Sequence, residues 1–408
     1  MLGFTVPIPD VPGLGNTLPV AFFFLCHVTI AEYSVGAITL ATAMEAHGAR
    51  SGDPRALRYA HSLGRSYYLV FSFGATLALF AVVLLTGLWG KQIGTLVNEL
   101  LPLIGLAFGL FLILTPLLVW YQHSFGAMRP GRHALLGAGV TFWQTLFVVL
   151  IVGLDSYLIT PDHGGLVETA LNPPYLPLLV HRLIGNASWA ALFLAGFAAL
   201  KGRRTEPGPE RDFQSWAAGV NLRIGLVLAL LMPVDGFILV EVLKHSQLGF
   251  FDNLIGSQGG LMVLQEVLVG TILVGGNIAL GAEREGGMRA SPSALAATVL
   301  SGGGMIVACM PAAVLGPDII GVRYAGLGLA VVATAFHLAA RMRPRRPAHG
   351  QRPVLLRRSL VTVGAVSVVT ALLMGYIKEH ARGDYAIYGE LRQVDAHGPF
   401  DPPRGLYP

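Results

Sequence analysis

Residues 172–197 read NPPYLPLLVHRLIGNASWAALFLAGF, and this stretch decides the fold. After Pro173 and Pro174 it continues as an apolar run of the length that a helix needs to cross a hydrocarbon core of roughly 30 Å. The run contains His181, and a second run, LPVAFFFLCHVTIAEYSVG at residues 18–36, contains His27. Ionisable side chains at such depth are costly and usually functional, and neutral imidazole is a common ligand of metals and heme iron. Both runs therefore predict transmembrane helices that carry a candidate ligand.

Similar apolar runs recur along the 408-residue chain, of which 53% is hydrophobic and only 12% charged. This composition predicts an all-α fold, a polytopic transmembrane helical bundle of about ten spans. We assign residues 1–377 to a single transmembrane, heme-binding bundle and residues 378–408 to an extracytoplasmic C-terminal tail. The spans are expected near residues 17–44, 66–89, 101–121, 135–158, 175–200, 217–243, 260–281, 293–315, 320–341 and 359–377.

Basic residues are unevenly distributed among the short loops between these spans. They follow the first, third, fifth, seventh and ninth spans, and the intervening loops are poor in Lys and Arg. Positive charge is held on the cytoplasmic side, so both termini are expected outside, with the chain in a bacterial cytoplasmic (inner) membrane. The net charge of +5 is then a topology signal, and no nucleic-acid binding is expected.

Under this topology the two histidines lie in the outer half of the membrane, His27 about ten and His181 about six residues inside the helix end. A histidine and a methionine can hold a six-coordinate b-type heme. Met232 and Met262 lie in spans where they could supply the second ligand. Each of these residues also has a structural interpretation, because membrane methionines usually only pack and a histidine can be a packing residue or a proton relay.

Three stretches resemble subunit I of the cytochrome bd-type quinol oxidases. They are PVAFFFLCHVTIAEYSVGAITLATAME at residues 19–45, GRSYYLVFSFGATLAL at 64–79 and LNPPYLPLLVHRLIGNASWAALFLAGFAAL at 171–200. The resemblance covers about the first half of the chain well and the rest weakly. It implies a membrane helical bundle that carries hemes and exchanges electrons with quinol.

The resemblance also assigns roles to single residues. His27 matches the first-helix histidine that ligates a high-spin heme in the family, and His181 matches the ligand of the low-spin b heme that receives electrons from quinol. The partner of that second heme would be Met262 or, alternatively, Met232.

The chain departs from the family at the oxygen-reducing centre. Family members carry two glutamates in the third helix, whereas this third span has only Glu99, at its outer edge, as a candidate proton-transfer group. The family's late glutamate ligand is missing, and the loop at residues 244–259 is far shorter than the family's quinol-binding loop. We therefore expect a divergent bd-like cytochrome b subunit that transfers electrons.

Two further acids lie inside predicted spans, Glu32 below His27 and Asp235 in the sixth span. An isolated charge at such depth costs several kcal/mol, so each should be protonated or paired. The functional interpretation is a proton exit for quinol oxidation or a hydrogen bond that orients a ligand imidazole. The structural interpretation is a polar contact between helices, with Arg223 or Asn221 as the partner.

Three functions remain open. The first is a b-type cytochrome subunit of a respiratory complex, an oxidoreductase subunit that passes electrons between quinol or quinone and an extracytoplasmic partner. That partner would be a multiheme cytochrome c or an iron–sulfur protein, and the polar tail could lie along it or be disordered. The second is a divergent bd-type terminal oxidase that reduces oxygen. The third is a heme-free proton or ion transporter, although no internal repeat supports it.

Overall fold

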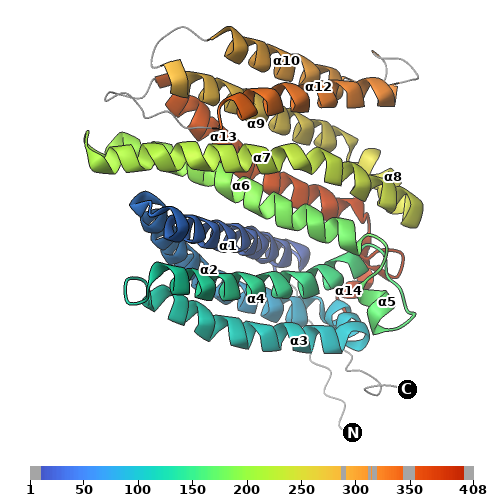
Figure 1. The fold of residues 1–408 in the computed structure, drawn as a ribbon. Coiled ribbons are helices and arrows are strands. Elements are labelled where there is room, and N and C mark those ends of the chain that lie inside the picture. Colours follow the sequence, from blue (N-terminus) through green and yellow to red (C-terminus); the bar gives the residue numbers. More distant parts are fainter. Residues whose placement is uncertain (1–10, 286–290, 311–313, 315–318, 343–353, 399–408) are drawn as a thin grey trace. The chain divides into compact units, whose positions relative to one another are not determined.

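The computed structural model describes residues 11–285, 291–310, 314, 319–342 and 354–398. In this part of the chain ten helices are long and apolar enough to cross a membrane, which confirms the all-α polytopic fold (Figure 1). They are α1 (Thr17–Ser51), α2 (Pro54–Leu88), α3 (Gly90–His123), α4 (Pro130–Tyr157), α6 (Tyr175–Arg204), α7 (Pro209–Ser246), α9 (Gly259–Glu285), α10 (Pro292–Cys309), α12 (Ile319–Ala340) and α13 (Val354–Ala381).

The remaining elements are short and connect or follow the long helices. Helix α5 (Leu166–Ala170) lies in the connection between α4 and α6, and α8 (Leu248–Ile255) lies in the short loop after α7. After α13 the chain forms two antiparallel strands, β1 (Tyr385–Ile387) and β2 (Leu391–Arg392), and then a final turn of helix, α14 (Gln393–Ala396).

Local sequence signals explain where the helices begin and end. Helix α2 begins twelve residues before the apolar run predicts, because the Asp53 carboxylate accepts a hydrogen bond from the Arg55 amide and Pro54 occupies the first turn. Helix α10 ends at Cys309, with Met310 extended, whereas the apolar run continues to residue 315. The cause is Pro311, because a residue that precedes proline is disfavoured in the helical region.

The chain divides into two compact units. Unit 1 comprises residues 1–183, 234–257 and 378–408, and unit 2 comprises residues 184–233 and 258–377. In unit 1, α1 packs against α2 and α4, and α3 packs against the same two helices, so that the four form a closed bundle (Figure 1). In unit 2, helices α9, α10 and α12 pack against one another.

The beginning of the segment that we assign to the tail is folded within unit 1. Ala386, Ile387 and Leu391 are buried in a cluster that also contains Trp89 and Tyr157. These strand residues therefore cover apolar side chains at the ends of α2 and α4. Residues 399–408 of the predicted tail lie outside the described residues.

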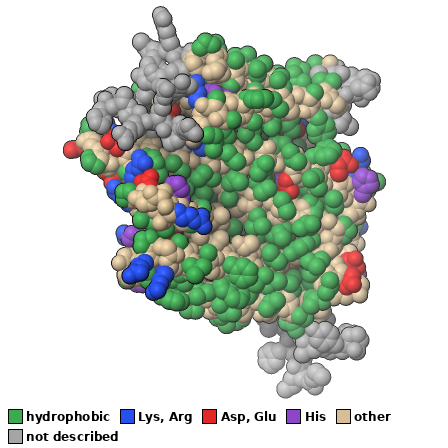
Figure 2. Space-filling model, in the orientation of Figure 1, with side chains coloured by type: hydrophobic (Ala, Val, Ile, Leu, Met, Phe, Trp, Pro, Cys, Tyr) green, Lys and Arg blue, Asp and Glu red, His purple; other side chains and the backbone are tan. Residues whose placement is uncertain are grey.

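Large apolar side chains cover the outward faces of the long helices. Leu135 is 74% exposed and Phe336 is 75% exposed, values that a bilayer accommodates and water does not. On the face shown in Figure 2, hydrophobic side chains cover most of the described surface. This distribution supports a multi-pass membrane protein.

Candidate functional site

His181 of α6 lies against Asp235 of α7 within unit 1. The imidazole Nδ1 lies 2.9 Å from Oδ2 of Asp235, and the two side chains are 23% and 10% exposed. A carboxylate only accepts hydrogen bonds, so Nδ1 carries a proton and donates it, and in the neutral imidazole the lone pair is on Nε2. The sequence predicted both residues separately, and the structure brings them together.

His27 of α1 is held by the backbone of α2. Its Nδ1 lies 3.1 Å from the carbonyl oxygen of Gly74. The two helices approach closely at this point, because a Cβ at Gly74 would lie 2.7 Å from Cγ2 of Ile30. A carbonyl oxygen only accepts, so Nδ1 again carries the proton and leaves the lone pair on Nε2.

Both histidines therefore have the chemistry of an axial heme ligand. An iron-ligating histidine almost always donates its other ring N–H to a carboxylate or a carbonyl, which sets the tautomer and the ring orientation. His27 and His181 are each only half-buried, so their rings are not enclosed by protein atoms. Among the described residues no three His, Cys, Asp or Glu side chains are grouped to hold a metal ion. A heme iron needs only one or two protein ligands, and these two donors fit it.

The two candidate methionines lie in unit 2, whereas both histidines belong to unit 1. Met232 precedes Pro233 in α7, and its Sδ would lie 3.7 Å from a Cβ at Gly185. Met262 lies in the first turn of α9, where its amide donates to the carbonyl of Gln258. Neither unit therefore contains both a candidate histidine and a candidate methionine.

Glu32 pairs with a residue that the sequence analysis did not consider. Its Oε1 accepts a hydrogen bond from Nη1 of Arg182, at 3.2 Å. The predicted partners were wrong, because Nη2 of Arg223 pairs with Glu283 at 2.6 Å and the amide of Asn221 donates to the carbonyl of Ala217. Arg182 follows His181 in the chain, so the helix turn that carries the histidine also carries the partner of Glu32.

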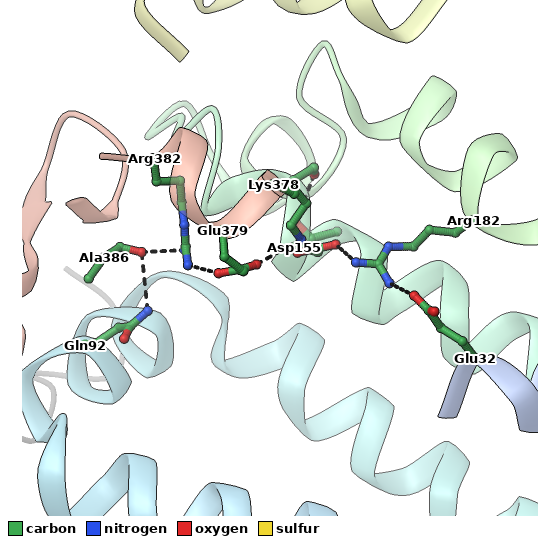
Figure 3. Close-up of polar contacts among 10 residues, drawn as sticks. Glu32, Gln92, Asp155, Arg182, Lys378, Glu379, Arg382 and Ala386 are labelled. Atoms are coloured by element: carbon green, nitrogen blue, oxygen red, sulfur yellow. Dashed lines mark hydrogen bonds and ion pairs between the residues drawn. The ribbon is translucent and has the colours of Figure 1, made fainter. Parts of the chain in front are cut away.

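Asp155 extends this pair into a network of alternating charges (Figure 3). Its two carboxylate oxygens accept from Arg182 and from Lys378, and Nζ of Lys378 also lies 3.3 Å from Glu379. The network joins α1, α4, α6 and α13. Its members lie far apart in the sequence, at positions 32, 155, 182, 378 and 379, so no local motif reveals the network. The available signal was that acidic and basic residues occur in, or at the ends of, four predicted spans.

The network ends at the C-terminal strands (Figure 3). Arg382 pairs with Glu379, and its Nη1 donates to the carbonyl of Ala386 at 2.7 Å. The amide of Gln92 donates to the same carbonyl at 3.4 Å. The charged Arg382 thus ties β1 to the end of α13, and the neutral amide of Gln92 ties it to α3.

Glu99, expected at the edge of the third span, lies inside α3 next to a kink at Leu100, because the helix begins at Gly90, before the predicted span. His163 lies between two carboxylates, with Nδ1 3.4 Å from Glu99 and Nε2 2.5 Å from Glu390. The hydrogen bond to Glu390 is the main cause that raises the pKa of the exposed His163. The structure therefore gives Glu99 a partner in the connection between α4 and α6, not one deeper in the membrane.

The comparisons with known proteins agree with this fold. No protein-family model matches the sequence, and no curated protein is similar to it. Among solved structures, a bd oxidase chain from Geobacillus thermodenitrificans is similar over 91% of this chain and 99% of that one, with 14% sequence identity and a TM-score of 0.51. Identity at this level carries the fold alone. The chain therefore has the fold of a bd oxidase chain.

Proposed function

We propose that this protein is a b-type cytochrome subunit of a respiratory complex in a bacterial inner membrane. It would pass electrons between a membrane quinol or quinone and an extracytoplasmic redox partner. The observation that carries the proposal is the hydrogen bonding of the two histidine side chains. Each directs its Nδ1–H to a fixed acceptor and keeps its Nε2 lone pair, in a chain with a bd oxidase fold.

His181 and His27 would each hold the iron of a heme b, with Met262 or Met232 as the candidate second ligand of the heme at His181. Bound heme supplies one-electron chemistry at a potential that its ligands and surroundings set. Asp235 would hold the imidazole of His181 in one tautomer. Glu32 would carry a proton released from quinol, and its contact with Arg182 would control its charge.

Two features of the sequence favour electron transfer over oxygen reduction. The third span has one glutamate where the family has two, and that residue, Glu99, is bound to His163 at the outer edge. The loop after α7 is short and contains α8, of which Phe250 and Leu254 are buried. A quinol would therefore bind at a site unlike the family's large loop, and a partner subunit would complete the reaction.

A divergent terminal oxidase is the second candidate, and the fold likeness to a bd oxidase favours it. Oxygen uptake separates the two candidates. A purified complex that oxidises quinol without consuming oxygen supports the transfer subunit, and quinol-dependent oxygen consumption supports the oxidase.

The decisive test is the reduced-minus-oxidised visible spectrum of the purified protein, with a pyridine hemochrome count, for wild type, His181→Ala and His27→Ala. His245→Ala is a matched control, because the Nδ1 of His245 also binds a carbonyl, that of Glu241, yet the side chain is 77% exposed at the helix end. We expect each of the first two variants to lose a b-type heme signal and the control to keep the wild-type spectrum. A wild-type protein without heme absorbance would contradict both redox functions and favour a transporter.

A further inference from the structure

A second polar cluster of unit 1 lies near the last turns of α1 and α3 and the first turn of α4. It consists of Glu45, Tyr121 and His133, whose side chains are all buried, with His133 only 2% exposed. Nδ1 of His133 is bonded to Oε1 of Glu45, and its Nε2 lies 2.9 Å from the backbone carbonyl of Tyr121. The Tyr121 hydroxyl lies 3.1 Å from the other carboxylate oxygen of Glu45.

These contacts determine how many protons the cluster holds. The Tyr121 carbonyl only accepts, so Nε2 of His133 must carry a hydrogen. Nδ1 and Oε1 would repel each other if both presented lone pairs, so one proton lies between them. The pair is thus either imidazolium and carboxylate or imidazole and carboxylic acid, and it is neutral in both forms.

Among the described residues, the polar side chains that contact or shift the pair are few. The titratable groups around it are Tyr121 of α3 and, on α2, Tyr67 and His61; none of these is a Lys or Arg. A well-packed apolar pair would be at least as stable as a buried ion pair, so stability alone does not explain these residues. Buried, mutually bonded ionisable groups gather at functional sites, so the pair is a candidate for proton transfer.

A single aromatic side chain separates the cluster from the surface. Phe125 stacks on the exposed His61 with ring centroids 4.5 Å apart, and it also contacts two rings of the cluster, His133 at 4.1 Å and Tyr121 at 5.0 Å. Gly64 makes room for it, because a Cβ there would lie 2.9 Å from Cε2 of Phe125. Movement of the Phe125 ring alone would therefore connect the buried imidazole with the surface imidazole.

Polar pairs continue along the same helices beyond the cluster. The Thr42 and Thr141 hydroxyls lie 2.8 Å apart, and the Tyr67 hydroxyl donates to Gln144 at 2.8 Å. A Cβ at Gly137 would lie 3.2 Å from the Thr42 hydroxyl and 2.9 Å from the Tyr121 ring, which places the first pair beside the cluster.

We propose that Glu45 and His133 form a proton-binding site that exchanges its shared proton with the solution at His61 when Phe125 moves. Only a proton is transferred: it leaves the bond between Nδ1 and Oε1, another replaces it from the surface side, and no electron changes place. By the distribution of basic loops, this end of unit 1 faces the cytoplasm. The site would take protons from that side.

The test is hydrogen–deuterium exchange of the shared proton, followed by infrared spectroscopy of the purified full-length protein. Ring-¹⁵N-labelled histidine and the variant Glu45→Gln identify the vibrations that belong to the pair. Phe125→Ala should exchange at least about tenfold faster than wild type, because exchange no longer waits for a local opening. Phe111→Ala is the matched control, since Phe111 is also an aromatic residue of this bundle and stacks on Phe71 instead.

Equal exchange rates in wild type and Phe125→Ala would contradict the role of Phe125 in controlling exchange. No change of the carboxyl or imidazole bands in Glu45→Gln would contradict the shared proton between Glu45 and His133. Phe125→Leu, which keeps most of the apolar volume, replaces the alanine variant if the latter does not fold, and it too should exchange faster. The measurement needs no redox group. Its outcome is therefore independent of whether the protein binds heme.

Discussion

At the scale of single residues, the contact between Asp235 and His181 has the largest chemical consequence. A carboxylate that accepts the Nδ1–H of an imidazole increases the electron density on Nε2 and restricts rotation of the ring. Asp235 is buried among apolar helices, so water screens its charge poorly and the effect on His181 is strong. Asp235 would thus tune the heme that His181 is proposed to hold.

Asp235→Asn should therefore leave heme bound but raise its midpoint potential by tens of millivolts. The asparagine oxygen still accepts from Nδ1, whereas the negative charge that favours oxidised iron is lost. Redox titration of the b-type absorbance measures the shift. Glu241→Gln removes a carboxylate from the same helix at a 39% exposed position and should leave the potential unchanged; equal shifts in both variants would contradict a direct effect on His181.

The sequence could predict these residues but not their contacts. His181 and Asp235 each stand out as ionisable groups in an apolar span, and that signal is local. Their contact depends on how α6 and α7 are rotated about their axes, which is set by packing along both helices. The same reason explains the wrong partners predicted for Glu32.

At the scale of elements, small residues determine how closely the helices of unit 2 approach. Gly304 of α10 faces Gly326 of α12, and a Cβ at Gly304 would lie 2.9 Å from the backbone nitrogen of Ala330. Lipid chains are as apolar as leucine, so helix association in a membrane depends on such close packing. The glycine-rich run SGGGM, at residues 301–305, contributes to this interface through one of its three glycines.

Gly304→Ala should destabilise the protein by about 1–3 kcal/mol, because the added methyl group forces α10 away from α12. Gly303→Ala is the adjacent control: a Cβ there meets nothing within 4 Å, so this variant should be neutral or slightly more stable. Thermal unfolding of the purified variants in one detergent measures the difference. Equal midpoints for the two variants would contradict the close approach of α10 and α12.

The C-terminal strands are the element that sequence reasoning described least well. Polar composition and terminal prolines at residues 378–408 favour a tail without a fold of its own. The structure nevertheless buries Ala386 and Ile387 and ties the segment to the bundle through Arg382. A short segment can fold in this way because an existing surface supplies the apolar contacts that it lacks alone.

At the scale of the whole molecule, the described helices and the basic loops define a topology. Ten spans return the chain to the side from which it started, and the loops rich in Lys and Arg alternate with loops that are not. We therefore expect both termini and the connection between α4 and α6 on the outer side, and the turn between α1 and α2 in the cytoplasm.

Single cysteines test this orientation in a background where Cys26 and Cys309 are replaced by serine. Val167→Cys, at a 62% exposed position in α5, should react with a membrane-impermeant maleimide added to cells whose outer membrane is permeabilised and whose inner membrane is intact. Ser51→Cys, at the exposed last residue of α1, should react only after the membrane is opened. Labelling in the reverse order would contradict the topology and also the cytoplasmic side assigned to His133.

The sequence by itself determined that this protein is a bundle of ten membrane helices and that His27 and His181 are its candidate ligands. In lipid every backbone polar group must be satisfied within its own helix, so apolar runs of sufficient length can form only one structure. Only the tertiary structure decided the Asp235–His181 contact, the network around Asp155 and the pair of Glu45 and His133. Each of these joins residues far apart in the chain, and which faces of the helices meet depends on the packing of the complete units.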